Sequence, residues 1–151
     1  MLDIDGANYV EMASYYMNNA STIASNNSGH GNMTSKSSVT GLTENSDVFE
    51  LVTSGNFGVK IKIAGQVFVS LNQDIITTGS TSYATSGIKK NGTLMAYQLI
   101  TNTNGQWDCI HNSVTMAISA NDVVEFYFSA AGLTALDGSS WAQYNFIWTA
   151  K

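Results

Sequence analysis

The stretch that decides the fold is DVVEFYF, residues 122–128. Val124, Phe126 and Phe128 alternate there with Val123, Glu125 and Tyr127. Because successive side chains of a β-strand point to opposite faces, this period predicts a strand that buries one face. The Asn121-Asp122 pair in front of it is typical of a turn.

The same period of two recurs from about residue 47 onward, with turn residues about every eight to twelve positions. Asn91-Gly92 predicts a two-residue hairpin turn, because both residues tolerate a positive φ. Phe57, Val59, Ile61 and Ile63 are expected on one face of a strand. Strands are expected over residues 56–64, 67–71, 83–89, 94–100, 114–118, 123–128 and 144–149. The pattern predicts an all-β antiparallel sandwich.

Residues 1–45 have a different pattern. Apolar residues at spacings of three and four suit one face of a short helix, namely Val10, Ala13, Met17, Ala20 and Ala24. Asn, Ser and Thr are weak helix formers, so an irregular arm or a first strand of the sandwich fits equally well. We expect residues 1–45 to form an N-terminal arm for attachment or trimerisation, and residues 46–151 to form one domain.

The composition excludes some partners. Of 151 residues, 18 are Ser, 15 Thr and 15 Asn, while Arg and Pro are absent and the formal net charge is −5. Nucleic-acid binding needs basic patches, which this chain lacks. No apolar run approaches the roughly 20 residues of a membrane-spanning helix, and the start lacks the pattern of a signal peptide. We therefore expect neither nucleic acid nor membrane as a partner.

Candidate catalytic or metal-ligating residues are few. His30 lies between glycines, and Cys109 with His111 offers two ligands where a zinc site needs three or four. The calcium-loop-like start at residues 3–8 has Ser14 where an EF-hand needs a glutamate. No GxSxG motif occurs. We expect no metal, no cofactor and no enzymatic activity. The enzymatic alternative is a glycan-cleaving enzyme with two apposed carboxylates.

Two tryptophans are candidates for recognition. Trp107 follows the polar residues 102–105, and Trp141 follows residues 137–140. Aromatic side chains beside loops stack on sugar rings or anchor a protein partner. The alternative is that each tryptophan covers one end of the core.

A series of motifs resembles the jelly-roll superfamily that unites the complement C-one-q head and tumour necrosis factor. In the family's order they are residues 54–57, 63–68, 90–92, 113–118, 121–124 and 144–147. The resemblance covers about residues 47–151. This sequence departs from it at Ala64-Gly65, where the family has Pro-Gly, and in the closing strand, which lacks the usual glycine.

The resemblance implies a ten-stranded antiparallel sandwich that is trimeric about a threefold axis, with aromatic side chains of one sheet at the subunit contact. Carried onto this sequence, the expected contact residues are Tyr144, Phe146, Trp148 and Phe126.

The Ser/Thr/Asn-rich composition without Arg or Pro also resembles that of phage structural proteins with such domains. The resulting hypothesis is a bacteriophage virion protein, a homotrimer on the virion surface that acts as a capsid decoration or knob, or as a small tail-fibre head. Its partners would be capsid or tail proteins and a host surface glycan or protein. The alternative is a carbohydrate-binding module or bacterial adhesin of the same fold.

Overall fold

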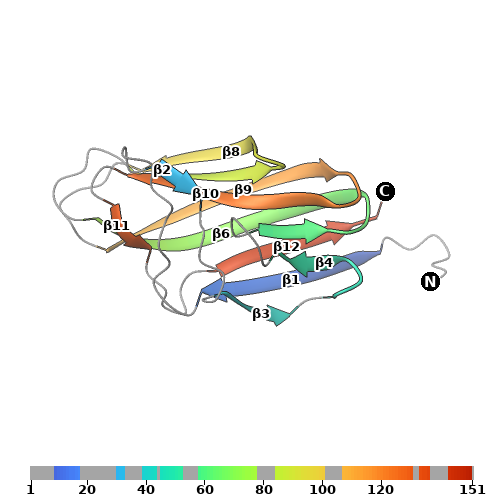
Figure 1. Cartoon of the computed structure of the whole chain (residues 1–151). Coiled ribbons are helices and arrows are strands. Elements are labelled where there is room, and N and C mark those ends of the chain that lie inside the picture. The colour runs from blue at the N-terminus through green and yellow to red at the C-terminus, as the bar shows by residue number, and fades with distance from the viewer. Residues whose placement is uncertain are drawn as a thin grey trace.

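The computed structural model describes residues 9–17, 30–32, 39–43, 45–52, 58–77, 84–100, 107–130, 133–136 and 143–150. These residues form two antiparallel sheets of six strands each, which pack against one another as a sandwich (Figure 1). The predicted fold class, an antiparallel jelly-roll sandwich, is confirmed.

The first sheet, here sheet A, has the strand order β11-β6-β12-β1-β3, and β9 pairs with β6. Its strands are β1 (Val10–Met17), β3 (Val39–Thr43), β6 (Gly65–Thr77), β9 (Trp107–Ile118), β11 (Leu133–Leu136) and β12 (Gln143–Thr149). The pairing of β6 with both β9 and β12 joins segments far apart in the sequence, as a jelly roll requires.

The second sheet, sheet B, has the order β4-β5-β10-β7-β8, and the short strand β2 pairs with β10. Its strands are β2 (His30–Asn32), β4 (Phe49–Leu51), β5 (Gly58–Ile61), β7 (Ala84–Lys90), β8 (Thr93–Ile100) and β10 (Asp122–Ala130). Most of the predicted strands are therefore present, several of them longer than the apolar period alone indicated.

Residues 1–45 contribute strands rather than a helix wherever the structure describes them. β1 lies between β12 and β3, so the first strand is an integral part of sheet A (Figure 1). The spacing of Val10, Ala13 and Met17 suggested a helix face, but Ala13 and Tyr15 are the buried positions and Met12 is exposed. Tertiary pairing with β12 outweighs the weak local pattern.

The core consists of the alternating apolar side chains that the two sheets turn toward each other. Val124, Phe126 and Phe128 of β10 are at most 1% exposed, as their period predicts. The Phe126 ring packs across the sandwich on Tyr144 of β12, with ring centroids 4.6 Å apart. Ile63 departs from its predicted face, because β5 ends at Ile61 and leaves Ile63 42% exposed in the connection to β6.

The predicted turns are present with the expected backbone. Asn91 and Gly92 have φ values of +49° and +79°, as a type I′ hairpin between β7 and β8 requires. Asn121 also has a positive φ, +68°, in the turn between β9 and β10. Asn and Gly supply these conformations in a chain that has no proline.

Gly65 allows β6 to approach β12 closely. A Cβ atom at this position would lie 2.4 Å from the carbonyl oxygen of Thr149 and 2.5 Å from Nε1 of Trp148. The indole nitrogen of Trp148 is itself held by donating to the carbonyl oxygen of Ile63 at 3.1 Å. Neither neighbour can move without breaking a backbone contact or this hydrogen bond.

We expect Gly65→Ala to lower the free energy of unfolding by about 2–3 kcal/mol, because the added methyl group forces the two strands apart. Urea unfolding followed by tryptophan fluorescence measures this loss. Gly92→Ala is the matched control: its Cβ would meet nothing within 4 Å, and only its positive φ opposes the substitution. An equal or smaller loss at Gly65 than at Gly92 would contradict the close approach.

Tyr144 also carries a polar group into the core. Its hydroxyl donates to Oε1 of Gln73, and both residues are fully buried. Burial raises the pKa of the Tyr144 phenol well above its ordinary value near 10. The folded chain therefore keeps this proton at a pH where the unfolded chain loses it, so the contribution to stability declines as pH rises past about 10.

We expect Tyr144→Phe to destabilise the chain by about 1–2 kcal/mol at neutral pH, because it removes a buried hydrogen bond. Its loss of stability above pH 10 should be shallower than that of the natural chain. Urea unfolding at several pH values tests both statements. A variant as stable as the natural chain would show that the hydroxyl contributes nothing.

Candidate interaction face

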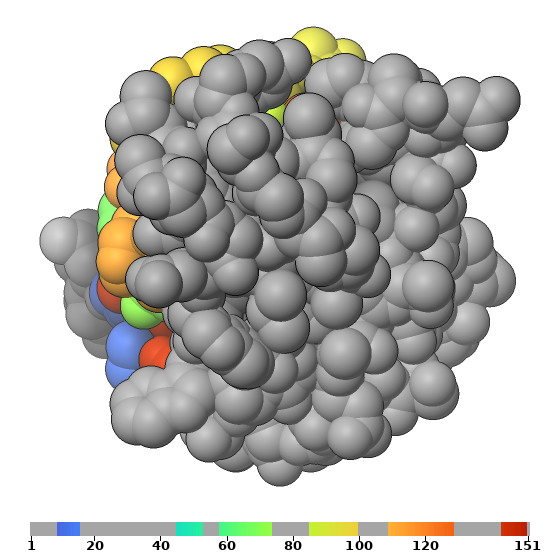
Figure 2. All heavy atoms as spheres, turned by 90° about the vertical axis from the view of Figure 1, so that its left-hand side faces the viewer, coloured from blue at the N-terminus to red at the C-terminus, as the bar shows by residue number. Residues whose placement is uncertain are grey.

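Among the side chains that the structure describes, the outward face of four neighbouring strands of sheet A carries no charge. Alternation along each strand directs one set of residues inward and the other outward. The outward set is Val10, Met12 and Ser14 of β1; Gln143, Asn145, Ile147 and Thr149 of β12; Gln66, Phe68, Ser70 and Asn72 of β6; and Cys109, His111, Ser113, Thr115 and Ala117 of β9. We call this set the uncharged face. Figure 2 shows atoms of these strands one above another along one side of the molecule.

A row of apolar side chains crosses the uncharged face. The strand registers place Met12 opposite Ile147 and Ile147 opposite Phe68. Met12 is 60% exposed, and Ile147 and Phe68 are each 38% exposed. Next to this row a shallow, largely apolar hollow of about 250 Å³ lies between β1 and β12. An apolar side chain of a partner would fit there.

The rest of the uncharged face consists mainly of hydroxyl and amide groups. Ser14 Oγ donates to Asn145 Oδ1 at 2.7 Å, and His111 Nδ1 donates to Asn72 Oδ1. These side chains satisfy one another in part and leave further donors and acceptors directed outward. The surface can therefore form hydrogen bonds with a partner without burying a charge.

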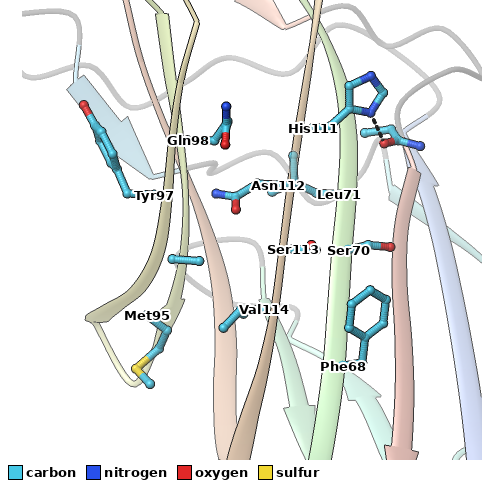
Figure 3. Close-up of a pocket in the computed structure, with 12 residues that line it drawn as sticks. Phe68, Ser70, Leu71, Met95, Tyr97, Gln98, His111, Asn112, Ser113 and Val114 are labelled. Atoms are coloured by element: carbon cyan, nitrogen blue, oxygen red, sulfur yellow. Dashed lines mark hydrogen bonds between the residues drawn. The ribbon is translucent and has the colours of Figure 1, made fainter.

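A groove of about 620 Å³ runs along one side of this face, where β8 of sheet B lies beside β9. Figure 3 shows Gln98 of β8 and Asn112 of β9 directed toward each other across it, with Phe68 and Ser70 of β6 farther along its floor. Asn112 Nδ2 donates to the carbonyl oxygen of Ser86 at 3.2 Å, which fixes one wall. Tyr97 is also among the residues that line the groove, although its ring points away from Gln98 and Asn112 in Figure 3.

A second exposed apolar surface lies on β8. Between Ile88 and Lys89 the register with β8 shifts, so that Leu94 faces Lys89, Tyr97 faces Gly87 and Leu99 faces Thr85. This bulge brings Leu94, Tyr97 and Leu99 to the outward face of sheet B, although their spacing does not suit a regular strand. They are 48%, 52% and 47% exposed. We call these three side chains the β8 stripe.

The remainder of the outward face of sheet B is charged. Lys60 lies 2.8 Å from Glu50, and this hydrogen bond lowers the pKa of the Glu50 carboxyl. Lys89 Nζ lies 4.8 Å from the centre of the Tyr127 ring. Away from the β8 stripe, sheet B thus presents charged groups to its surroundings, whereas the uncharged face of sheet A presents neutral polar and apolar side chains.

The expected subunit contact through Tyr144, Phe146, Trp148 and Phe126 needs correction. All four side chains are at most 2% exposed, because they form the core between the sheets. A side chain that has no exposed surface in the single chain cannot lose surface to a second copy. The residues of β12 that face outward are the alternate set, including Asn145 and Ile147.

The other predicted site residues are only partly placed. Trp107 begins β9 and His30 begins β2, but their side chains, and all of Trp141, lie outside the described part of the structure. Cys109 is exposed on β9. Within the described ranges, no group of three or more His, Cys, Asp or Glu side chains could hold a metal ion. None of the described residues forms a helix long and apolar enough to cross a membrane.

Comparison with known proteins identifies the fold. No protein-family model matches the chain, and no curated protein matches its sequence. Among solved structures, murine APRIL at pH 5.0 superposes with a TM-score of 0.71 at 10% identity, covering 93% of this chain and 99% of that one. Eiger TNF from S. frugiperda superposes with a TM-score of 0.64 at 11% identity, covering 94% of each chain. The chain has a tumour-necrosis-factor-like jelly-roll fold.

Proposed function

We propose that this chain is a structural protein of a bacteriophage virion, a homotrimeric jelly roll on the particle surface that serves as a capsid decoration or knob, or as a small fibre head. The observation that carries the assembly is the uncharged face of sheet A. Charged residues are depleted in the core of protein interfaces, while the exposed surface of a soluble protein normally carries them. We therefore assign this face to the contact between copies.

Two unlike surfaces favour a ring rather than a twofold dimer. The uncharged face lies on sheet A, whereas the β8 stripe lies on sheet B at the edge of the sandwich. When the stripe of one copy packs on the uncharged face of the next, a single contact covers both surfaces, and three such contacts close into a ring when each rotates the next copy by about 120°. The likeness to the tumour necrosis factor superfamily favours three copies.

The contact residues in this proposal are Met12, Phe68 and Ile147 on one side and Leu94, Tyr97 and Leu99 on the other. They replace the aromatic core residues expected from the sequence. An exposed apolar edge strand would otherwise promote aggregation, so covering the β8 stripe also protects the folded chain.

We expect light scattering on a sizing column to give three times the 16.2 kDa mass of the chain. Ile147→Asp should reduce this mass to that of one chain, because it places an uncompensated carboxylate in the contact. Ile63→Asp is the matched control, with 42% exposure against 38% at Ile147 and a position outside both surfaces. A natural chain that runs as a monomer, or a trimer that tolerates Ile147→Asp, would refute the assigned contact.

The proposed location on a virion rests on the composition of the chain. A surface that is rich in hydroxyl and amide groups and poor in charge resembles that of phage structural proteins with such domains. Residues 1–45 would supply the contacts to capsid or tail proteins. The same segment contributes β1 and β3 to sheet A. Trp107 and Trp141 are the proposed contacts with a host surface glycan or protein, where three weak sites would act with avidity.

We expect mass spectrometry and immunogold labelling of purified particles of the encoding phage to locate the chain on the particle surface. Particles with Trp107→Ala and Trp141→Ala should adsorb to host cells more slowly, with unchanged particle yield and an Ile63→Ala control at the normal rate. Normal adsorption would remove the tryptophans from the proposal and leave the virion role standing. Absence of the chain from particles, together with glycan binding by the isolated protein, would favour the carbohydrate-binding alternative.

A further inference from the structure

The hairpin between β7 and β8 ends in a chemically labile pair, Asn91-Gly92. In such a pair the glycine nitrogen can attack Cγ of the asparagine side chain. A new N–Cγ bond forms, the Cγ–Nδ2 bond breaks, and Nδ2 leaves as ammonia. Water then opens the resulting succinimide to aspartate or isoaspartate. The reaction needs no cofactor, only a glycine nitrogen that can lose its proton and a side chain free to approach it.

Both reacting groups are held apart by β10. Asn91 Oδ1 accepts from the backbone nitrogen of Val123 at 2.8 Å, and Asn91 Nδ2 donates to Oδ1 of Asp122 at 2.7 Å. The Asn91 backbone nitrogen also donates to the Val123 carbonyl oxygen at 2.9 Å. The side-chain amide is thus fixed by both of its polar atoms and cannot turn toward the following residue.

The attacking nitrogen is engaged as well. Gly92 N donates to Oε2 of Glu125 at 3.0 Å. The N–H bond therefore points at a carboxylate rather than at Cγ of Asn91, and the neighbouring negative charge opposes formation of the anionic nitrogen that attacks. These contacts link the hairpin tip to β10 in the sandwich, at the end of the molecule where β8 begins (Figure 1).

We propose that Asn91 is a latent deamidation site, closed in the folded chain by Glu125, Asp122 and Val123 and opened by local separation of the hairpin tip from β10. Conversion is also damaging once it occurs. The product places a carboxylate where Asn91 Nδ2 now donates to Asp122, so a hydrogen bond is replaced by two like charges. Asp122 in turn accepts from Ser119 N at 2.8 Å, so the loss extends to the turn between β9 and β10. The proposal concerns the single folded chain and is independent of how copies assemble.

The decisive comparison is between the folded and the urea-unfolded natural chain at mildly alkaline pH, with peptide mapping by mass spectrometry over time. We expect Asn91 to convert roughly tenfold or more slowly in the folded chain, because the tip must first open. The second Asn-Gly pair, Asn104-Gly105, is an internal reference for the unfolded rate. Equal conversion of Asn91 in the folded and unfolded chains would overturn the proposal without any variant.

Substitutions identify the groups that close the site. Glu125→Ala should accelerate conversion of Asn91 severalfold in the folded chain, and Glu125→Gln, which keeps an acceptor for Gly92 N, should accelerate it less. Glu50→Ala is the control, since it removes a carboxylate from the same sheet away from the hairpin and should leave the rate unchanged. An unchanged rate in a folded Glu125→Ala variant would exclude the role of Glu125.

The cost of conversion is measured by Asn91→Asp, which should lower Tm by several degrees. Ala64→Asp adds the same charge at an exposed loop position and should leave Tm nearly unchanged. An Asn91→Asp variant with the natural Tm would show that conversion leaves the contacts between the hairpin tip and β10 intact. That result would refute the damaging effect.

Discussion

The packing of Phe126 on Tyr144, with ring centroids 4.6 Å apart, joins the two sheets, and the rest of the structure depends on it. Phe126 belongs to β10 in sheet B and Tyr144 to β12 in sheet A. Phe146 extends the same cluster, 6.1 Å from Phe126. The one cysteine of the chain, Cys109, cannot form a disulfide within it, and this buried aromatic layer is a main part of the packing between the sheets.

Burying these aromatics determines what the other face of each strand can do. Because the period of a strand is two, Tyr144 and Phe146 in the core oblige Asn145 and Ile147 to face outward. The neighbouring strands follow through their registers, and Phe68 of β6 comes to lie beside Ile147. The packing of the core therefore does not determine which residue types occupy the uncharged face. Its lack of charge is a property that folding alone does not require.

Strand positions and turns could be read from the sequence because each rests on local physics. Alternation located β10 and β12, and the tolerance of Asn and Gly for positive φ located the tips at residues 91–92 and 121. The side of a strand that meets the core was harder to read. Tyr144 and Trp148 suit either a core or an interface, and only the burial of this face of β12 in the folded chain distinguishes the two. The β8 stripe could not be predicted for another reason. A one-residue bulge moves Leu94 onto the face of Tyr97, and no local sequence pattern indicates the bulge.

The neutral character of the uncharged face can be recognised in the sequence once the strands are known. Once β6, β9 and β12 are assigned, every outward position from Gln66 to Asn72, from His111 to Ala117 and from Gln143 to Thr149 is occupied by a neutral side chain. The described acids and lysines lie mostly on the strands of sheet B and in the turns at their ends, including Glu50, Lys60, Lys89 and Glu125. An overall deficit of charge, which first suggested only an amide and hydroxyl surface, is thus concentrated on one sheet. Charged residues are depleted in the core of protein interfaces, so this segregation of charge is the observation on which the proposed contact between copies rests.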